Sequence, residues 1–275
     1  MDPIHILILA AAGLAAGFVA GLIGVGGGVI FAPVLFFHYQ ALGVSSSEIA
    51  PLTIGSSLFC TLIAAVISAR AQYGRKAVVT RVALSVGAFS ALAVYLMTRF
   101  VTTQPWYDGT VFQIVFSLIL LVLVTRMVVR PRQDAIEGAQ DARRFGWPAL
   151  AGTGTVAGAV ASAAGVGGGV VLVPAYTHFF RFPIHVATGT SSATIVLIAL
   201  VGVVNYVWLG QGADVPELAI GYVDAVRALT LALPATLTAH LGVWTAHRIN
   251  RRALRLTFAA LAGLVAVRLL WNAVA

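Results

Sequence analysis

The five-residue sequence GVGGG occurs twice in this chain, at residues 24–28 and again at residues 165–169. Both copies lie inside long apolar stretches. Glycine supports a helix less than any residue except proline, so four glycines in five positions predict that each stretch is broken there. Because the same break occurs twice, we expect it to be part of the architecture.

The sequence around the two glycine runs is repeated as well. Residues 13–33 align with residues 154–174 at a constant offset of 141, and twelve of the twenty-one positions are identical. Upstream of each run, small residues recur every four positions, on one face of a helix. This pattern is typical of a close helix-packing surface in membranes. The positions are Gly13, Gly17 and Gly21 in the first half, and Gly154, Gly158 and Ser162 in the second.

The composition is that of a polytopic membrane protein. The 275 residues are 60% hydrophobic and 9% charged, whereas a soluble domain has about 25% charged residues. The sequence pI of about 10.4 does not indicate a nucleic-acid partner, because the basic residues lie in short loops between apolar stretches. One cysteine, Cys60, excludes a disulfide within the chain and is expected to serve packing.

Apolar stretches of about bilayer length predict the membrane segments. They cover residues 4–41, 49–69, 78–98, 110–130, 147–180, 186–209, 222–246 and 253–274. Arginine and lysine cluster around residues 70–81, 126–144 and 248–255. The positive-inside rule makes these three regions cytoplasmic.

Length and charge together predict an all-α fold of two inverted-topology repeats. Residues 1–130 form the first membrane repeat, residues 131–146 a cytoplasmic linker, and residues 147–275 the second repeat. Each repeat is expected to be a glycine-broken helical hairpin followed by three transmembrane helices, which gives eight to ten membrane segments. Both termini are predicted to be non-cytoplasmic. Inverted repeats are typical of secondary transporters.

The glycine runs are the first candidate binding site. Unwound backbone at membrane depth survives only where it lines a cavity or is buried in protein. The helix after each run would direct its amides and positive dipole end at the break, which suits a small anion. The alternative is a tight turn whose amides bond to protein groups or water. The candidate substrate-binding residues are Gly24, Gly26, Gly27 and Gly28 in the first run, and Gly165, Gly167, Gly168 and Gly169 in the second.

Hydroxyl-rich sequence provides the second candidate. Residues 187–194 read ATGTSSAT, and residues 52–57 read LTIGSS. At the start of a span such residues would cap a helix and offer donors to an oxyanion. Alternatively, they bond within or between helices. The candidates are Thr53, Ser56, Ser57, Thr188, Thr190, Ser191 and Ser192.

Ionisable residues inside the spans are few. The nine acidic residues fall in loops or near span ends, whereas cation transporters and proton pumps usually carry a carboxylate in the membrane. Arg227 is expected to extend to the interface rather than to attract anions. His38 and His178, at the ends of the two hairpins, are expected to be structural or interfacial. No metal-binding or cofactor motif occurs, so no cofactor is expected, and an enzyme is disfavoured.

The doubled GxxxGxxxGxxGVGGGVxxxP pattern and the sequence HVATGTSSATI at residues 185–195 resemble the TauE/SafE family of sulfite exporters and anion permeases. The resemblance covers nearly the whole chain. It implies export of a small sulfur oxyanion such as sulfite, or of an organosulfonate such as sulfoacetate. It also implies that the glycine runs and residues 188–192 are the functional motifs. The insertion SSSEIAPLT weakens this match at Ser56 and Ser57.

The predicted function is therefore outward transport of a small sulfur-containing anion across the cytoplasmic membrane by alternating access. The alternatives are a passive channel, or an importer of another anion such as thiosulfate or a carboxylate. The expected partners are the anion and the lipid bilayer, with no nucleic acid. The sequence leaves a homo-oligomer open.

Overall fold

The computed structural model describes residues 3–23, 27–129, 145–246 and 251–274. Within these ranges the chain is helical, apart from connecting turns and one isolated β-bridge between Ile220 and Val223. The helices are α1 (Pro3–Ile23), α2 (Gly28–Ala41), α3 (Ser46–Gly74), α4 (Thr80–Met97), α5 (Gly109–Val129), α6 (Trp147–Ala164), α7 (Gly169–His178), α8 (Ile184–Leu209), α9 (Ala225–Ala246) and α10 (Arg251–Val274). A π-helical turn, η1 (Thr98–Thr102), continues α4.

The helices have the length and composition of membrane segments. Four carry windows long and apolar enough to cross a bilayer, namely Pro3–Ala20, Ser46–Gly74, Thr80–Thr102 and Ile184–Leu209. Shorter apolar helices cover Gly28–Ala41, Gly109–Thr125, Ala225–Ala239 and Ala262–Val274. Large apolar side chains such as Leu7, Leu237 and Trp271 are exposed on the outside, as lipid contact requires. The predicted all-α polytopic membrane fold is confirmed.

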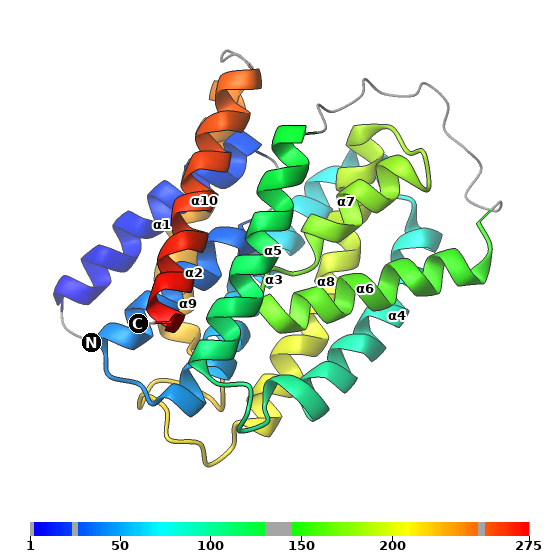
Figure 1. Cartoon of the computed structure of the whole chain (residues 1–275). Coiled ribbons are helices and arrows are strands. Elements are labelled where there is room, and N and C mark those ends of the chain that lie inside the picture. The colour runs from blue at the N-terminus through cyan, green and yellow to red at the C-terminus, as the bar shows by residue number, and fades with distance from the viewer. Residues whose placement is uncertain (1–2, 24–26, 130–144, 247–250, 275) are drawn as a thin grey trace.

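The order of the helices is the same in the two halves. A broken pair, α1 and α2, precedes α3, α4 and α5, and a second broken pair, α6 and α7, precedes α8, α9 and α10. The predicted linker lies almost entirely outside the described residues. In Figure 1 the pair α1 and α9 lies at the left of the molecule, and the pair α4 and α6 lies at the right.

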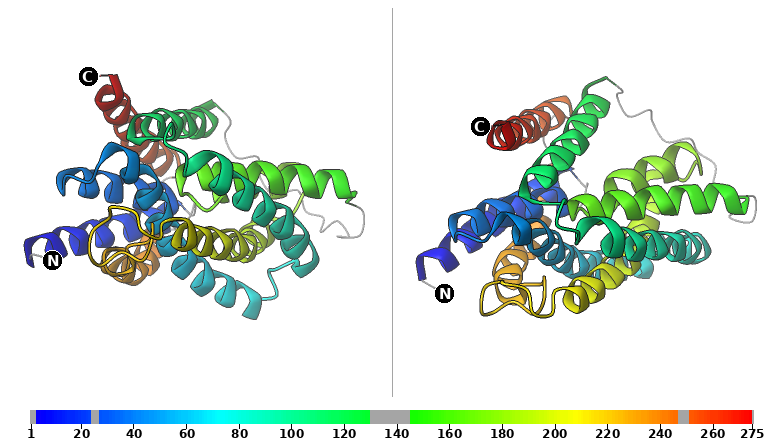
Figure 2. Two further views of the ribbon diagram at one scale, coloured as in Figure 1. Left: turned by 90° about the horizontal axis from the view of Figure 1, so that it is seen from below. Right: turned by 60° about the horizontal axis from the view of Figure 1, so that its bottom comes forward.

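These two pairs show that each half packs its first helix against the other half. A β-carbon at Gly13 or Gly17 of α1 would overlap the carbonyl oxygen of Leu231 or Ala235 in α9. In the same way, a β-carbon at Gly154 or Gly158 of α6 would meet the carbonyl oxygens of Val86 and Ser90 in α4. The small residues that recur every four positions were predicted to form packing faces, and this role is confirmed at these four glycines. Figure 2 shows the two pairs on opposite sides of α3 and α8.

The central helices α3 and α8 make a matching pair of hydrogen bonds. Ser56 Oγ of α3 accepts the amide of Asp224, just before α9, at 2.9 Å. Thr190 Oγ1 of α8 accepts the amide of Val79, just before α4, at 3.0 Å. We call these two bonds the cross-repeat bonds, since each fastens a central helix of one half to a helix start in the other.

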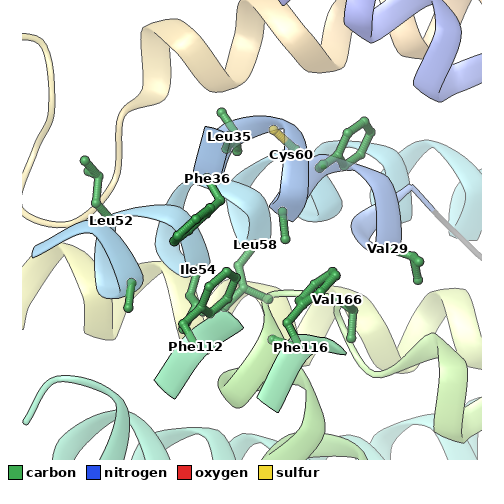
Figure 3. Close-up of a cluster of buried hydrophobic side chains, with 14 of the residues drawn as sticks. Val29, Leu35, Phe36, Leu52, Ile54, Leu58, Cys60, Phe112, Phe116 and Val166 are labelled. Atoms are coloured by element: carbon green, nitrogen blue, oxygen red, sulfur yellow. The ribbon is translucent and has the colours of Figure 1, made fainter. Parts of the chain in front are cut away.

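Apolar side chains from both halves fill the space around α3. Phe112 and Phe116 extend from α5 toward α3, and Val166 of the second glycine run lies beside Phe116 (Figure 3). Phe112 also stacks on Phe36 of α2, with ring centroids 5.3 Å apart. This packing holds the second glycine run against α3 in the interior of the protein.

Candidate functional site

The second glycine run forms the predicted break between α6 and α7. Gly165, Gly167 and Gly168 have φ values of 69°, 69° and 78°, in the left-handed region that only glycine adopts without steric cost. The amide of Gly165 closes α6 by donating to the carbonyl of Ala161 at 2.8 Å. Gly168 is the N-cap of α7, and α7 begins at Gly169. Here the sequence requires glycine because three of the four residues 165–168 have left-handed backbone.

Side chains from other parts of the chain donate hydrogen bonds to the carbonyl groups at the broken end of α6. Ser57 Oγ of α3 donates to the carbonyl of Gly165 at 2.8 Å. The hydroxyl of Tyr107, in the turn before α5, donates to the carbonyl of Ala163 at 2.7 Å. The last carbonyls of a helix have no partner within it, so these donors fix the broken end in place. Burial raises the pKa of Tyr107 well above its ordinary value, so this hydroxyl stays protonated and donates.

Three hydroxyl residues lie on one face of α3 beside this break. Thr53, Ser57 and Thr61 are spaced by four residues and are buried. Thr61 packs directly against the glycine run, because a β-carbon at Gly167 would lie 2.5 Å from Thr61 Cγ2. Ser57 is bonded to the run, but Thr53 Oγ1 and Thr61 Oγ1 have no hydrogen-bond partner among the described residues.

Helix α8 approaches the run from the other side. Ile195 Cγ2 would lie 3.1 Å from a β-carbon at Gly167, and Ser191, one turn earlier on the same face, is buried. Ser191 Oγ also has no partner in the described part of the chain. Leaving a buried hydroxyl unpaired costs about 1–3 kcal/mol. Three such groups therefore lie on two helices that flank one unwound segment, and each can still donate a hydrogen bond.

The first glycine run is described only in part. Gly24 and Gly26 lie outside the described residues. Gly27 is the N-cap of α2, which begins at Gly28. A β-carbon at Gly28 would lie 2.8 Å from the backbone of Val166, so the two runs meet in space. The described parts of the two runs are therefore in contact, at Gly28 and Val166.

The other hydroxyl candidates have structural roles. Both Ser56 and Thr190 accept the cross-repeat bonds. Thr188 Oγ1 donates to the carbonyl of Ile184 one turn earlier at 2.9 Å. Ser192 Oγ bonds to Ser68 Oγ at 2.9 Å and to the carbonyl of Thr188 at 3.0 Å. Of the predicted hydroxyls, Thr53, Ser57 and Ser191 therefore lie on the helix faces that flank the break.

The prediction that these hydroxyls cap the starts of spans is wrong. Helix α3 already begins at Ser46 and α8 at Ile184, so the hydroxyl-rich stretches lie inside the helices. Pro183 occupies the N-cap of α8, where a proline costs no helical hydrogen bond. Pro51 lies inside α3, and the helix continues through it.

A family model described as sulfite exporter TauE/SafE matches residues 9–269. The chain belongs to the TauE/SafE family. A probable membrane transporter protein of Methanocaldococcus jannaschii is 24% identical over 267 residues, with 96% of this chain and 94% of the relative covered. A probable membrane transporter protein of Haemophilus influenzae is 25% identical over 265 residues, with 96% and 97% covered. No solved structure matches the chain.

Two ionisable residues of this TauE/SafE chain differ from expectation. Arg227 does not extend to the interface: it is 8% exposed and forms an ion pair with the carboxylate of Asp224. Asp224 is at the start of α9, as expected for an acid near a span end, but it is fully buried. The sequence held a signal for Asp224, because an aspartate directly before an apolar helix is typical of an N-cap. Its carboxylate accepts the amide of Arg227 at 3.0 Å.

Cys60 is buried, as expected for a packing residue, and its thiol donates to the carbonyl of Ala228 at 3.3 Å. No group of three or more histidine, cysteine, aspartate or glutamate side chains in the described ranges is arranged to hold a metal ion. The chain is thus a multi-pass membrane transporter by family, with hydroxyl and glycine backbone groups at its buried break.

Proposed function

We propose that this protein is a secondary transporter that moves a small sulfur-containing anion outward across the cytoplasmic membrane. The substrate class is sulfite or an organosulfonate such as sulfoacetate. The observation that carries the proposal is the set of buried hydroxyls of Thr53, Thr61 and Ser191 beside the broken helix, which have no hydrogen-bond partner in the described part of the chain. The family description as a sulfite exporter supports the sulfur assignment.

The chemistry of these groups suits an anion that is stripped of water. A sulfite or sulfonate group offers three oxygen acceptors, and the hydroxyls of α3 and α8 supply donors. The first amides of α7 have no partner within their helix, and the positive end of its dipole lies at the glycine run. These neutral donors stabilise a negative charge without a fixed cation, so the anion can be bound and then released.

Alternating access would use the two halves as rocking bodies. The cross-repeat bonds at Ser56 and Thr190 are matching contacts between them. The equivalent residues Ser57 and Ser191 differ, however, because Ser57 is bonded to Gly165 and Ser191 Oγ lacks a partner within the described residues. We propose that this asymmetry marks one of two states and is reversed in the other. The arginine-rich loops would face the cytoplasm, and both termini the opposite side.

Flux through liposomes tests the proposal. The purified protein is reconstituted, and movement of sulfite, sulfoacetate, taurine, sulfate and chloride is followed with and without a pH gradient. Saturable transport of sulfite or sulfoacetate is expected, with little transport of sulfate or chloride. Non-saturable flux would instead support a passive channel. Movement of sulfate or chloride without movement of sulfite or sulfoacetate would contradict the sulfite and sulfonate assignment.

A matched pair of variants tests the site. Thr61→Val removes the hydroxyl with little change in shape. The loss of one hydrogen bond to a charged ligand, about 1.5–3 kcal/mol, should weaken substrate affinity by about tenfold to a hundredfold. The control is Thr125→Val, since Thr125 is exposed on α5 and donates to the carbonyl of Leu121 within its own helix. Equal affinity in the two variants would refute the role of Thr61.

A further inference from the structure

Helices α2, α3 and α7 are each followed by one residue with left-handed backbone. These residues are Gly43, Lys76 and Arg181, with φ values of 74°, 56° and 52°. In each case the next amide returns to a carbonyl five or six residues earlier, at 2.9 to 3.2 Å, and closes the helix end. Glycine is the usual residue at such a position, because a β-carbon is unfavourable there. A lysine and an arginine are therefore unexpected.

Glycine and the two cations are divided between the ends of the bundle. The helices α2 and α7 hold the same place in the two halves, yet α2 is followed by Gly43 and α7 by Arg181. The helices α3 and α8 also correspond, yet α3 is followed by Lys76 and α8 by Gly212, which has a φ of 83°. The two glycines lie at the end that we predict to be non-cytoplasmic, and the two cations at the end that we predict to be cytoplasmic. On that side a cation is kept against a local conformational cost, which is typical of a functional position.

The positive-inside rule accounts for the charge of these loops but not for its position in the turn. Near Lys76, positive charge is already provided by other exposed residues, namely Arg70, Arg75 and Arg81. Beside Arg181, Phe179 has an ordinary φ of −85° and is 77% exposed, so a cation there would face outward without strain. Topology alone therefore does not explain why cations occupy the two left-handed positions.

Both cations lie at the start of α8. Arg181 comes three residues before the first residue of this helix. The loop of Lys76 packs on the first turns of the same helix, because a β-carbon at Gly189 would overlap the carbonyl of Ala77. The cross-repeat bond of α8 holds this loop as well. The two turns therefore meet the same end of one helix, although they belong to different halves of the chain.

This end of α8 leads to the glycine break. Ser191, which flanks the break, follows the first residue of α8 by seven positions, or about 10 Å along the helix axis. Neither Lys76 nor Arg181 forms an ion pair within the described residues. The acidic residues of the described ranges lie at the other end of the bundle, and they are Glu48, Asp108, Asp214, Glu217 and Asp224. Uncompensated charge of one sign raises the local concentration of oppositely charged solutes.

We propose that the turns at Lys76 and Arg181 form a recruitment site for small anions at the cytoplasmic end of α8, from which the anion passes to the glycine break. The two exposed cations attract a hydrated anion, so the site concentrates the anion without removing its water. The inference rests on the proposed function, and it adds the residues that the anion meets first. The left-handed turns fix where the two charges leave the backbone.

Alkylation of an introduced cysteine measures the electrostatic potential at this place. His185→Cys puts a thiol between the two turns, since the exposed His185 lies one turn before Gly189 on the same face of α8. The thiolate sulfur displaces iodide either from iodoacetate, an anion, or from iodoacetamide, which is neutral. The ratio of the two rates cancels differences in thiolate fraction and access. The chain without this substitution, whose Cys60 is buried, gives the background.

Glycine variants remove each charge and suit the left-handed backbone, so they should fold at least as well as the parent. A unit charge about 10 Å away in water changes the rate of an anionic reagent about twofold at low salt. Lys76→Gly and Arg181→Gly should therefore each lower the ratio of iodoacetate to iodoacetamide rates about twofold, and Lys76→Arg should keep it. The control is Arg99→Gln, at the other end of the bundle, which should not change it. An unchanged ratio in both glycine variants, or an equal loss in the control, would overturn the proposal.

Anionic lipid is the other partner that exposed cations at a membrane surface attract. The rates are therefore measured in nanodiscs of phosphatidylcholine, and again in nanodiscs of equal parts phosphatidylcholine and phosphatidylglycerol. An effect of the glycine variants that persists in both supports recruitment of a soluble anion. If phosphatidylglycerol abolishes the effect, lipid headgroups occupy the two turns and the recruitment site is overturned.

Flux distinguishes this inference from the proposed function. In phosphatidylcholine liposomes at low salt, Lys76→Gly should raise the KM for sulfite about twofold and leave the maximal rate unchanged, and about 1 M salt should remove the difference. An unchanged KM at low salt would overturn the recruitment site. Saturable sulfite flux with an unchanged alkylation ratio would leave the transport proposal intact and refute recruitment. A changed alkylation ratio without flux of any sulfur anion would keep the anion-attracting site and refute the transport proposal.

Discussion

Replacing Gly167 by alanine tests the glycine break directly. Gly167 has a φ of 69°, where an L residue costs about 1–2 kcal/mol. The new methyl group would lie 2.5 Å from Thr61 Cγ2 and 3.1 Å from Ile195 Cγ2, and overpacking of this kind costs about 1–3 kcal/mol. The two terms act on the folded state together, so we expect Gly167→Ala to destabilise the protein by about 2–5 kcal/mol.

The assay is thermal unfolding in detergent, measured together with two further variants. Thr61→Ser removes the methyl group that the alanine would strike, so the double variant should recover the steric part of the loss but not the backbone part. Gly152→Ala is the control, because no atom lies within 4 Å of its added methyl group and alanine favours a helix interior. If Gly167→Ala were as stable as Gly152→Ala, or if Thr61→Ser gave no recovery, the packing argument would be refuted.

Two further predictions concern helix packing and the broken end of α6. Gly17→Ala should lower stability and expression strongly, because its methyl group would overlap backbone atoms of Ala235, which cannot move aside as a side chain can. The control is Gly263→Ala, which has open space around the added methyl group. Equal melting temperatures of the two variants would contradict close packing of α1 on α9. Ser57→Ala should lower the free energy of unfolding by about 1–3 kcal/mol, because it leaves the buried carbonyl of Gly165 without its donor. Thermal unfolding measures this loss. A variant as stable as the parent would show that the hydrogen bond is dispensable.

The sequence predicted those features that depend on local chemistry. The glycine run at residues 165–169 needs left-handed backbone, and its composition indicates this directly. The four-residue spacing of Gly13 and Gly17 predicted a packing face, because a helix places such residues on one side. Apolar length predicted the membrane class. In each case the residues that carry the pattern and the feature that they predict lie within one turn or one helix.

Other features were missed or predicted wrongly because their partners are far away in the chain. Arg227 was expected at the membrane interface, but the fold encloses it together with Asp224 between helices of both halves. Thr61 was not singled out, since a threonine in an apolar helix looks like an ordinary packing residue. Only its contact with Gly167 makes it a site candidate.

The sequence by itself determined that the chain enters the membrane several times, breaks two helices at glycine runs and repeats its pattern. These properties follow from hydrophobicity, length and backbone freedom, which each segment carries independently of the others. Only the tertiary structure decided which helix the small-residue face of α1 or α6 packs against. It also decided which hydroxyls have no partner among the described residues. A buried hydroxyl has a structural role when a distant backbone group bonds to it, and is available to a ligand when none does. The amide of Asp224 bonds to Ser56, whereas no described group bonds to Ser191.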